Sequence, residues 1–278
     1  MSSWRLRDRV LDFPPPLAAG IVNVTDDSFY EGARSGTPSQ AVQDGVRLVE
    51  DGFDLLDVGA VPARSGPSVP AEDEAGRLVP TVRGLAERTG VPVLADTFSP
   101  EVARRALEAG ASAINDISGG ANRDLLDAVA EAEAGYVLMH IEGPPRADRE
   151  APRYGDPVAH LLEWFERGIE TAVGAGIAEE RIALDPGLDF DLSLADDIEI
   201  IRRVSELRPL GRPLFVALSR KDFLGAVVAG SWEDRLDASE RGPATLAATA
   251  LVVAEGAEVL RLHDIEALDA MRVAAAIR

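Results

Sequence analysis

The feature that most constrains this chain is an eightfold alternation of short apolar runs with longer amphipathic segments. Each run has the length and composition of a buried strand, and helical spacing of apolar residues follows it. The predicted strands span residues 18–24, 53–58, 91–96, 111–117, 135–141, 181–185, 213–219 and 257–263. The predicted helices span residues 38–52, 72–88, 99–110, 123–133, 157–175, 194–207, 244–255 and a closing segment that ends at residue 278. Such repeats join parallel strands through right-handed crossovers, so the pattern predicts an α/β protein.

We expect the eight units to close into a single (β/α)8 barrel, the TIM barrel, whose usual size this chain matches. An open, doubly wound sheet gives similar local patterns and remains an alternative. The sequence contains neither a G-x-G-x-x-G dinucleotide loop nor a P-loop, which weakens that alternative. No low-complexity linker interrupts the alternation, so we expect residues 1–278 to form one domain, with residues 1–17 as an N-terminal extension.

Composition narrows the classes of function. The net charge of −20 would repel a phosphate backbone, so we expect no nucleic-acid partner. No stretch reaches the roughly 20 apolar residues of a membrane span, and residues 1–17 lack the apolar core of a signal peptide. The chain has no cysteine, which excludes disulfides and thiolate metal sites. Together these features predict a cytoplasmic protein without a membrane partner.

Polar residues stand at the end of every predicted strand. In a (β/α)8 barrel the active site lies at the carboxyl ends of the strands, so these residues are the candidates for function. One strand-end Asp or Asn usually only caps a loop, but eight such ends in succession favour a site. We expect His160, which falls inside a predicted helix, to be a surface residue. The strand-end residues in chain order are Asn23, Asp57, Asp96, Asn115, Asp116, His140, Asp185, Ser219, Arg220, Lys221, Arg261, His263 and Asp264.

The candidates divide into two chemical groups. Asp96, Asn115 and Asp185 would converge on the barrel axis, where their oxygens suit the amino and ring N–H groups of a flat heterocycle. The second group is cationic in an otherwise acidic chain, and with the amide of Asn23 it suits a diphosphate and a divalent cation. Its members are Arg64, Lys221, Arg261 and His263.

The strand-end motifs resemble those of the dihydropteroate synthases. The segment 20–29, GIVNVTDDSF, resembles the family's signature loop, G-I-L-N-V-T-P-D-S-F. The resemblance continues, in order and over nearly the whole chain, through Ala95-Asp-Thr97, Ile114-Asn-Asp-Ile117, Val137-Leu-Met-His140, Leu184-Asp-Pro-Gly187, Leu218-Ser-Arg-Lys-Asp-Phe223 and Arg261-Leu-His-Asp264.

The resemblance implies a reaction and roles for individual residues. It implies that 6-hydroxymethyl-7,8-dihydropterin diphosphate is joined to p-aminobenzoate, giving 7,8-dihydropteroate and diphosphate on the folate pathway. Asn23 would bind Mg²⁺, and the pterin would be held by Asp96, Asn115, Asp185 and Lys221. The diphosphate would be bound by Arg64, Arg261 and His263. The aminobenzoate side would be shaped by Phe29, Arg64, Phe190, Ser219 and Lys221.

The chain departs from the family pattern in three loops. Asp26 replaces a proline of the signature loop, and residues 59–66 read GAVPARSG where the family usually has G-G-E-S-T-R-P-G. Asp189 stands at a usual glycine, where we expect it to narrow or re-polarise the pocket. A paralogue that binds pterin without catalysis therefore stays open as an alternative, and a methyltetrahydrofolate-binding methyltransferase is a third possibility that would not need a diphosphate site.

The predicted helix near residues 244–254 is unusually apolar. Dimers are common among enzymes of the family that the chain resembles, so this helix is a candidate interface of a possible homodimer. Packing against the barrel explains the same pattern.

Overall fold

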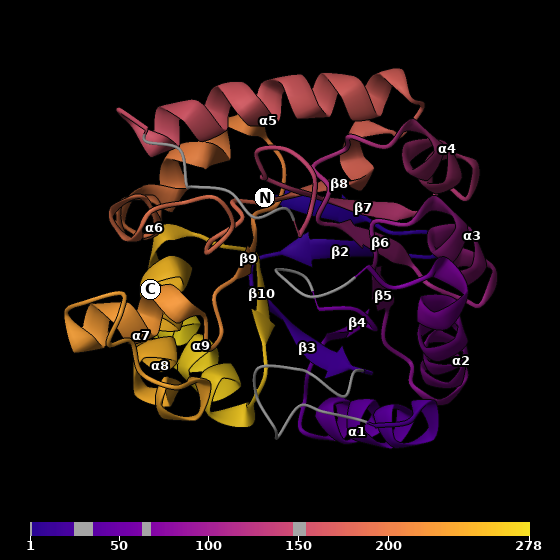
Figure 1. The fold of residues 1–278 in the computed structure, drawn as a ribbon, viewed down its shortest axis with the longest axis horizontal. Helices are drawn as coiled ribbons and strands as arrows, with labels where there is room; N and C mark the ends of the chain where they lie inside the picture. The colour runs from indigo at the N-terminus through magenta and orange to yellow at the C-terminus, as the bar shows by residue number, and fades with distance from the viewer. Residues whose placement is uncertain (1, 25–35, 63–67, 147–153) are drawn as a thin grey trace.

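The computed structural model describes residues 2–24, 36–62, 68–146 and 154–278. Eight parallel strands form one sheet in the order β8-β7-β6-β5-β4-β3-β10-β9, and a parallel bridge between Leu184 and Leu214 joins its two outer strands. The predicted (β/α)8 barrel is confirmed, with the helices arranged around the strands (Figure 1). The strands are β3 (Leu17–Asn23), β4 (Leu55–Gly59), β5 (Val93–Asp96), β6 (Ala113–Asp116), β7 (Gly135–Met139), β8 (Ile182–Asp185), β9 (Phe215–Ala217) and β10 (Val259–Leu262).

The helices between the strands begin where the sequence supplies capping residues. The side chain of Ser99 accepts from the N–H of Val102 and is followed by Pro100, which suits a first helical turn. Ser193 and Asp196 form a reciprocal capping box. The helices are α1 (Pro38–Glu50), α2 (Ala71–Arg88), α3 (Pro100–Glu108), α4 (Arg123–Glu131), α5 (Pro157–Gly174), α6 (Leu194–Arg203), α7 (Asp222–Ala229), α8 (Gly242–Glu255) and α9 (Ile265–Ile277).

Alternation along the strands decides which side chains enter the barrel. One residue of each strand belongs to a buried cluster inside the barrel: Ala19, Leu55, Leu94, Ala113, Val137, Ala183, Phe215 and Val259. Residues two positions further along a strand lie on the same face. Asp57, Asp96, Asn115, Asp185 and Arg261 stand two positions beyond members of this cluster, so they lie at the carboxyl-terminal mouth.

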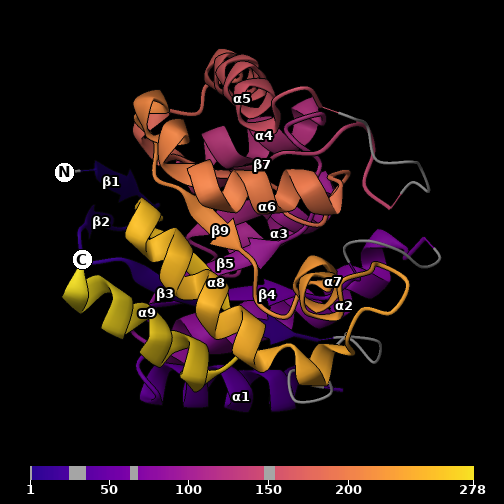
Figure 2. The same ribbon diagram turned by 90° about the vertical axis from the view of Figure 1, so that its left-hand side faces the viewer.

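A β-hairpin closes the opposite end of the barrel. Strands β1 (Ser2–Arg5) and β2 (Val10–Phe13) pair antiparallel and lie beside both termini, at the left of Figure 2. Trp4, Leu6 and Phe13 are buried in the same cluster as the barrel interior, and the indole N–H of Trp4 donates to the carbonyl of Arg181 at 2.7 Å. The sequence pattern did not predict this hairpin, because its strands are short and the second is followed by Pro14-Pro15-Pro16.

Helix α7 also lies outside the predicted elements, in the long connection that follows β9. Helix α6 ends earlier than predicted, and a 3₁₀ helix continues it over Val204–Leu210. Across the described ranges, the helices include none that is both long and apolar enough to cross a membrane.

Candidate active site

A group of buried polar side chains occupies the mouth of the barrel. Asp57 accepts a hydrogen bond from the amide nitrogen of Asn115 at 3.1 Å. The guanidinium of Arg261 donates from Nε to the same Asp57 and from Nη2 to Asp96 at 3.1 Å. The predicted residues Asp96, Asn115 and Arg261, from three different strands, are thus brought into one network with Asp57.

Asp57 is central to this network, although the sequence pattern assigns it no role in the reaction. It is fully buried, and its oxygen Oδ1 has no hydrogen-bond partner among the described residues. Its position at the end of the second predicted strand is the available signal, but a single strand-end Asp is weak evidence. The side-chain oxygen of Asn115 is likewise buried and unpaired within the described part of the chain, so it can accept from a bound N–H group.

Burial changes the charge of two carboxyls in this group. Desolvation and the nearby Asp57 carboxylate raise the pKa of Asp96 to about 7, although Arg261 opposes the shift. Desolvation raises the pKa of Asp185 to about 6, opposed chiefly by Lys221. Asp185 also accepts the N–H of Gly187 at 2.9 Å, which orients one oxygen of the carboxyl. Strongly perturbed carboxyls in a strand-end group are typical of a functional site.

Lys221 lies directly before helix α7. Its ammonium donates to the carbonyl of Leu188 and lies 4.8 Å from the centre of the Phe190 ring, a cation–π contact. Burial lowers the pKa of Lys221, and the Asp185 carboxylate opposes that shift. The predicted residues Lys221, Asp185 and Phe190 are therefore neighbours.

His263 and Ser219 form a second contact near Arg261. The ring nitrogen Nδ1 of His263 lies 2.9 Å from the Ser219 hydroxyl. Burial lowers the pKa of His263 to about 3, and the positive charges of Arg261 and Arg220 add to the shift. An anion bound here would reverse that effect and favour protonation, as expected of a phosphate-binding histidine.

Apolar side chains border the polar group. Ile117, Met139 and Ile141 form a small buried cluster, and Phe98 and Phe190 pack against it. Of these five residues, the sequence pattern indicates only Phe190. The polar network together with this apolar border suits a flat heterocycle, which needs hydrogen bonds at its edge and apolar contacts at its faces.

Asn23 ends strand β3 and is half-buried. A Cβ added to the neighbouring Gly59 would lie 3.6 Å from the side-chain oxygen of Asn23 and 3.5 Å from Oδ2 of Asp96. Two hard oxygen atoms thus flank Gly59 at the mouth. Oxygen atoms of this kind are the ligands that Mg²⁺ takes, usually one or two from the protein, with water and substrate phosphate completing its shell.

Three strand-end residues have other roles. Asp116 faces outward and accepts from the Tyr136 hydroxyl at 2.7 Å and the Ser118 hydroxyl at 2.6 Å. Arg220 and Asp264 form an ion pair at 2.7 Å. Asp116 is buried, Arg220 and Asp264 are half-buried, and these contacts hold each side chain outside the polar network at the mouth.

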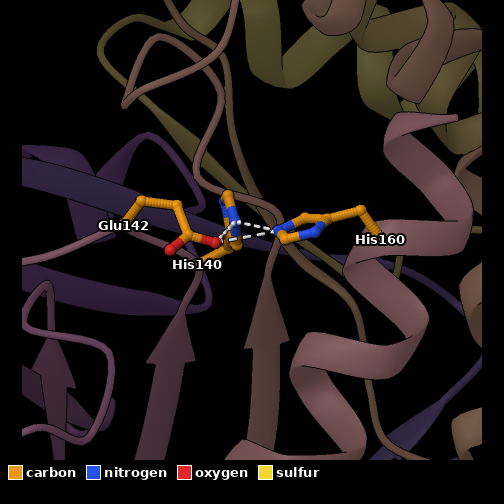
Figure 3. A group of neighbouring side chains, drawn as sticks. All are labelled: His140, Glu142 and His160. Atoms are coloured by element: carbon orange, nitrogen blue, oxygen red, sulfur yellow. Dashed lines mark hydrogen bonds and ion pairs between the residues drawn. The ribbon is translucent and has the colours of Figure 1, made fainter. Parts of the chain in front are cut away.

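His140 also turns away from the mouth, and the expectation of a surface His160 was wrong. Residues 139 and 141 face inward, and the ring of His140 points toward helix α5, where its Nε2 lies 3.2 Å from Nε2 of His160 (Figure 3). His160 is half-buried. A helical wheel could not reveal this contact, since it depends on which strand the helix covers.

The expectation that Asp189 re-polarises the pocket is supported in part, because its negative charge opposes the lowering of the Lys221 pKa. Asp189 has a left-handed backbone with φ of 69°. Its carboxylate accepts the backbone N–H groups of Asp222 at 2.6 Å and Phe223 at 3.0 Å, at the start of α7. The side chain that replaces the usual glycine therefore caps a helix.

The remaining predicted residues, Phe29 and Arg64, lie outside the described residues, as does Asp26.

Several known proteins are similar to this chain in sequence and in fold. The family described as "Pterin binding enzyme" matches residues 19–263. The dihydropteroate synthase of Escherichia coli K12 is 35% identical over 265 residues, covering 95% of this chain and 92% of that protein. A structure of Xanthomonas albilineans dihydropteroate synthase with 4-aminobenzoic acid has 38% identity and a TM-score of 0.88, covering 99% and 98% of the two chains. A structure of the same enzyme with 7,8-dihydropteroate has 36% identity and a TM-score of 0.86, with the same coverage.

Proposed function

The chain belongs to the family of pterin-binding enzymes, and we propose that it catalyses the dihydropteroate synthase reaction with Mg²⁺. The substrates would be 6-hydroxymethyl-7,8-dihydropterin diphosphate and p-aminobenzoate, and the products 7,8-dihydropteroate and diphosphate. The observation that carries this proposal is the network at the barrel mouth, where Arg261 bridges Asp57 and Asp96 and Asn115 donates to Asp57.

Each part of the reaction has a candidate group. The pterin's amino and ring N–H groups would donate to Asp96, Asp185 and the unpaired oxygen of Asn115. The C–O bond to the diphosphate would break with its electron pair leaving on oxygen, and the amine of p-aminobenzoate would form the new C–N bond and lose a proton. The carboxylates would stabilise positive charge that develops on the pterin methylene.

The cationic residues would stabilise the leaving diphosphate. Arg261 uses Nε to contact Asp57 and Nη2 to contact Asp96. Within the ranges that the structure describes, its third nitrogen, Nη1, makes no hydrogen bond. Nη1 is therefore available to an anion, and the charge of Arg261 acts on His263, whose ring contacts the Ser219 hydroxyl. Mg²⁺ at Asn23 would neutralise charge on the diphosphate, the usual role of this ion in such reactions.

The test is diphosphate release by the purified protein. We expect release only when the pterin diphosphate, p-aminobenzoate and Mg²⁺ are all present, and omission of any one should reduce release to background. Asp185→Asn should bind the pterin more weakly and turn over more slowly. Binding of the pterin diphosphate without turnover would instead support the non-catalytic paralogue.

A homodimer is part of the same proposal. Leu251 on α8 is 57% exposed and Val273 on α9 is 61% exposed, and these large apolar side chains are candidates for contact with a second copy. Light scattering of the wild type and of Leu251→Glu tests this, and we expect the variant to shift toward the monomer. A dimer unaffected by the substitution would place the interface elsewhere.

Two further expectations stay predictions. We propose that the whole chain acts as one domain, supported by the packing of Trp4 and Phe13 against the barrel interior. A cytoplasmic location remains the expectation from composition, to be tested by fractionation of cells that express the chain.

A further inference from the structure

A second cluster of metal-ligand atoms lies apart from the mouth of the barrel. His140, Glu142 and His160 each offer one ligand atom, and these atoms all lie within 4.8 Å of one another. Nε2 of His160 is 3.0 Å from Oε1 of Glu142, and Nε2 of His140 is 3.8 Å from the same oxygen. Figure 3 shows the two rings and the carboxylate turned toward a common point.

The spacing fits a tetrahedral metal ion. Ligand atoms about 2.0–2.1 Å from a zinc ion in tetrahedral geometry lie roughly 3.3 Å apart. The three separations here, 3.2, 3.0 and 3.8 Å, bracket that value. Two imidazoles and one carboxylate leave the fourth position to water, an arrangement known for zinc.

Hydrogen bonding alone satisfies the cluster poorly. At most one proton can lie between the two facing Nε2 atoms, while the Glu142 carboxylate adds a third acceptor to the same space. His140 is fully buried, and its other ring nitrogen, Nδ1, has no hydrogen-bond partner among the described residues. A divalent cation would satisfy all three acceptors together.

The surroundings hold the ligands in place and leave a route to solvent. The His140 ring packs edge-on against Trp164 with ring centres 5.0 Å apart, and the ring centre of Tyr154 lies 4.2 Å from that of His160. The side chain of Glu142 is 40% exposed and that of His160 is 25% exposed. A metal ion can therefore enter from the solvent side, past Glu142 and His160, and reach the buried ring of His140, which packs against Trp164.

We propose that His140, Glu142 and His160 form a binding site for a borderline divalent transition metal of the Zn²⁺ type, distinct from the Mg²⁺ site proposed at the mouth. Imidazole nitrogen favours such metals over Mg²⁺, which takes oxygen ligands. The bound ion joins the end of β7 to helix α5 across the connection that links them.

The site is also linked to the loop that follows β8. The backbone N–H of Glu142 donates to Asp191 at 3.2 Å, and Asp191 directly follows Phe190. His140 stands between Met139 and Ile141, whose side chains pack with Phe190 at the mouth. A metal ion on the outer side of β7 thus stabilises the backbone that carries these inward side chains.

The experiment titrates Zn²⁺ into the full chain without substrates and with Mg²⁺ in excess, by calorimetry and thermal unfolding. We expect one Zn²⁺ per chain and a Tm rise of about 5 °C at a hundredfold excess over Kd. Co²⁺ in place of Zn²⁺ should give the visible absorption of a tetrahedral site. His160→Ala and Glu142→Gln test the ligands, and Glu163→Gln, a carboxylate on α5 outside the cluster, is the matched control.

The variants decide the outcome. Loss of a residue that only hydrogen-bonds to a metal ligand weakens metal binding by about 10–100-fold, so loss of a ligand in His160→Ala should weaken Zn²⁺ binding by at least about 100-fold. Glu163→Gln should bind as the wild type does. Equal Zn²⁺ affinity in wild type and His160→Ala would mean that the ion binds elsewhere, and absence of saturable binding to the wild type would show that the cluster is only hydrogen-bonded; either result overturns the proposal.

Discussion

The carboxyl groups of Asp96 and Asp185 have pKa values raised by burial into the range where cells operate. Both carboxyls therefore retain a proton to higher pH than an exposed Asp does, and a ligand that donates hydrogen bonds to the carboxylate would favour the ionised form. Binding of the pterin and the protonation of these residues should be coupled.

The first prediction follows from this coupling. The affinity for 6-hydroxymethyl-7,8-dihydropterin should fall by up to about tenfold per pH unit as the pH drops below the pKa of Asp96, because a growing fraction of the carboxyl must first lose its proton. Asp96→Asn should bind the pterin more weakly, and above the pKa of Asp185 its affinity should change less with pH than that of the wild type. Calorimetric titration across this range measures both. An unchanged slope in Asp96→Asn would assign the titration to another group.

The raised pKa of Asp185 also makes the unfolding free energy of the protein depend on pH. The pKa of Asp185 rises from its ordinary value of 3.8 to about 6 in the folded protein, so folding favours the protonated form. The stabilisation is complete below the unfolded pKa and is lost as the pH rises through about 6.

At alkaline pH the unfolding free energy of Asp185→Asn should therefore exceed that of the wild type by about 1–3 kcal/mol, which moves its urea midpoint higher. At acidic pH the two proteins should have equal unfolding free energies. Urea denaturation at the two pH extremes measures the difference. A variant less stable than wild type at alkaline pH would show that the ion pairing with Lys221 outweighs desolvation. The expected gain in stability with loss of binding is the signature of a residue retained for function.

At the scale of elements, helix α7 depends on a residue from another part of the chain. Its N-cap, Lys221, makes no capping side-chain bond, and Asp189 supplies the acceptor from 33 positions earlier. This explains why the sequence did not predict the helix: the residues just before Asp222 carry no cap signal. Short strands β1 and β2 escaped prediction for a related reason, since the barrel interior that they cover stabilises them.

Asp189→Ala removes the cap and places alanine in a left-handed conformation. We expect a loss of about 1–2 kcal/mol from the cap, with a further cost of about 1 kcal/mol from the backbone. Asp189→Asn is the control, because asparagine both caps helices and tolerates this conformation. Chemical denaturation of the two variants measures the difference, and equal stability would contradict the capping role.

At the scale of the whole molecule, the sequence predicted the barrel well because each strand–helix unit carries its own local pattern. The site was predicted in part: Asp96, Asn115, Asp185, Lys221 and Arg261 meet at the mouth. The pairing of Arg261 with Asp57, and the outward turn of His140, depend on strand alternation and on contacts between distant units. Those contacts are set by closure of the barrel and have no local signal.

The hairpin end of the barrel gives a prediction that separates stability from activity. Trp4 is fully buried in the cluster inside the barrel, so Trp4→Ala should cost about 3–5 kcal/mol of unfolding free energy. Because the mouth lies at the other end, KM values should change little at a temperature where the variant is folded. Arg5→Ala, an exposed neighbour, should change stability by less than about 0.5 kcal/mol. A large change in KM for Trp4→Ala would contradict this separation.

The same hairpin has a consequence for biosynthesis. The Ser2 hydroxyl donates to Glu258 across 256 positions of sequence, and Trp4 packs edge-on against Phe215. Strands β1 and β2 leave the ribosome before these partners have been translated. Trp4 and Phe13 must therefore remain uncovered while most of the chain is made, and during that interval they are natural targets for chaperones.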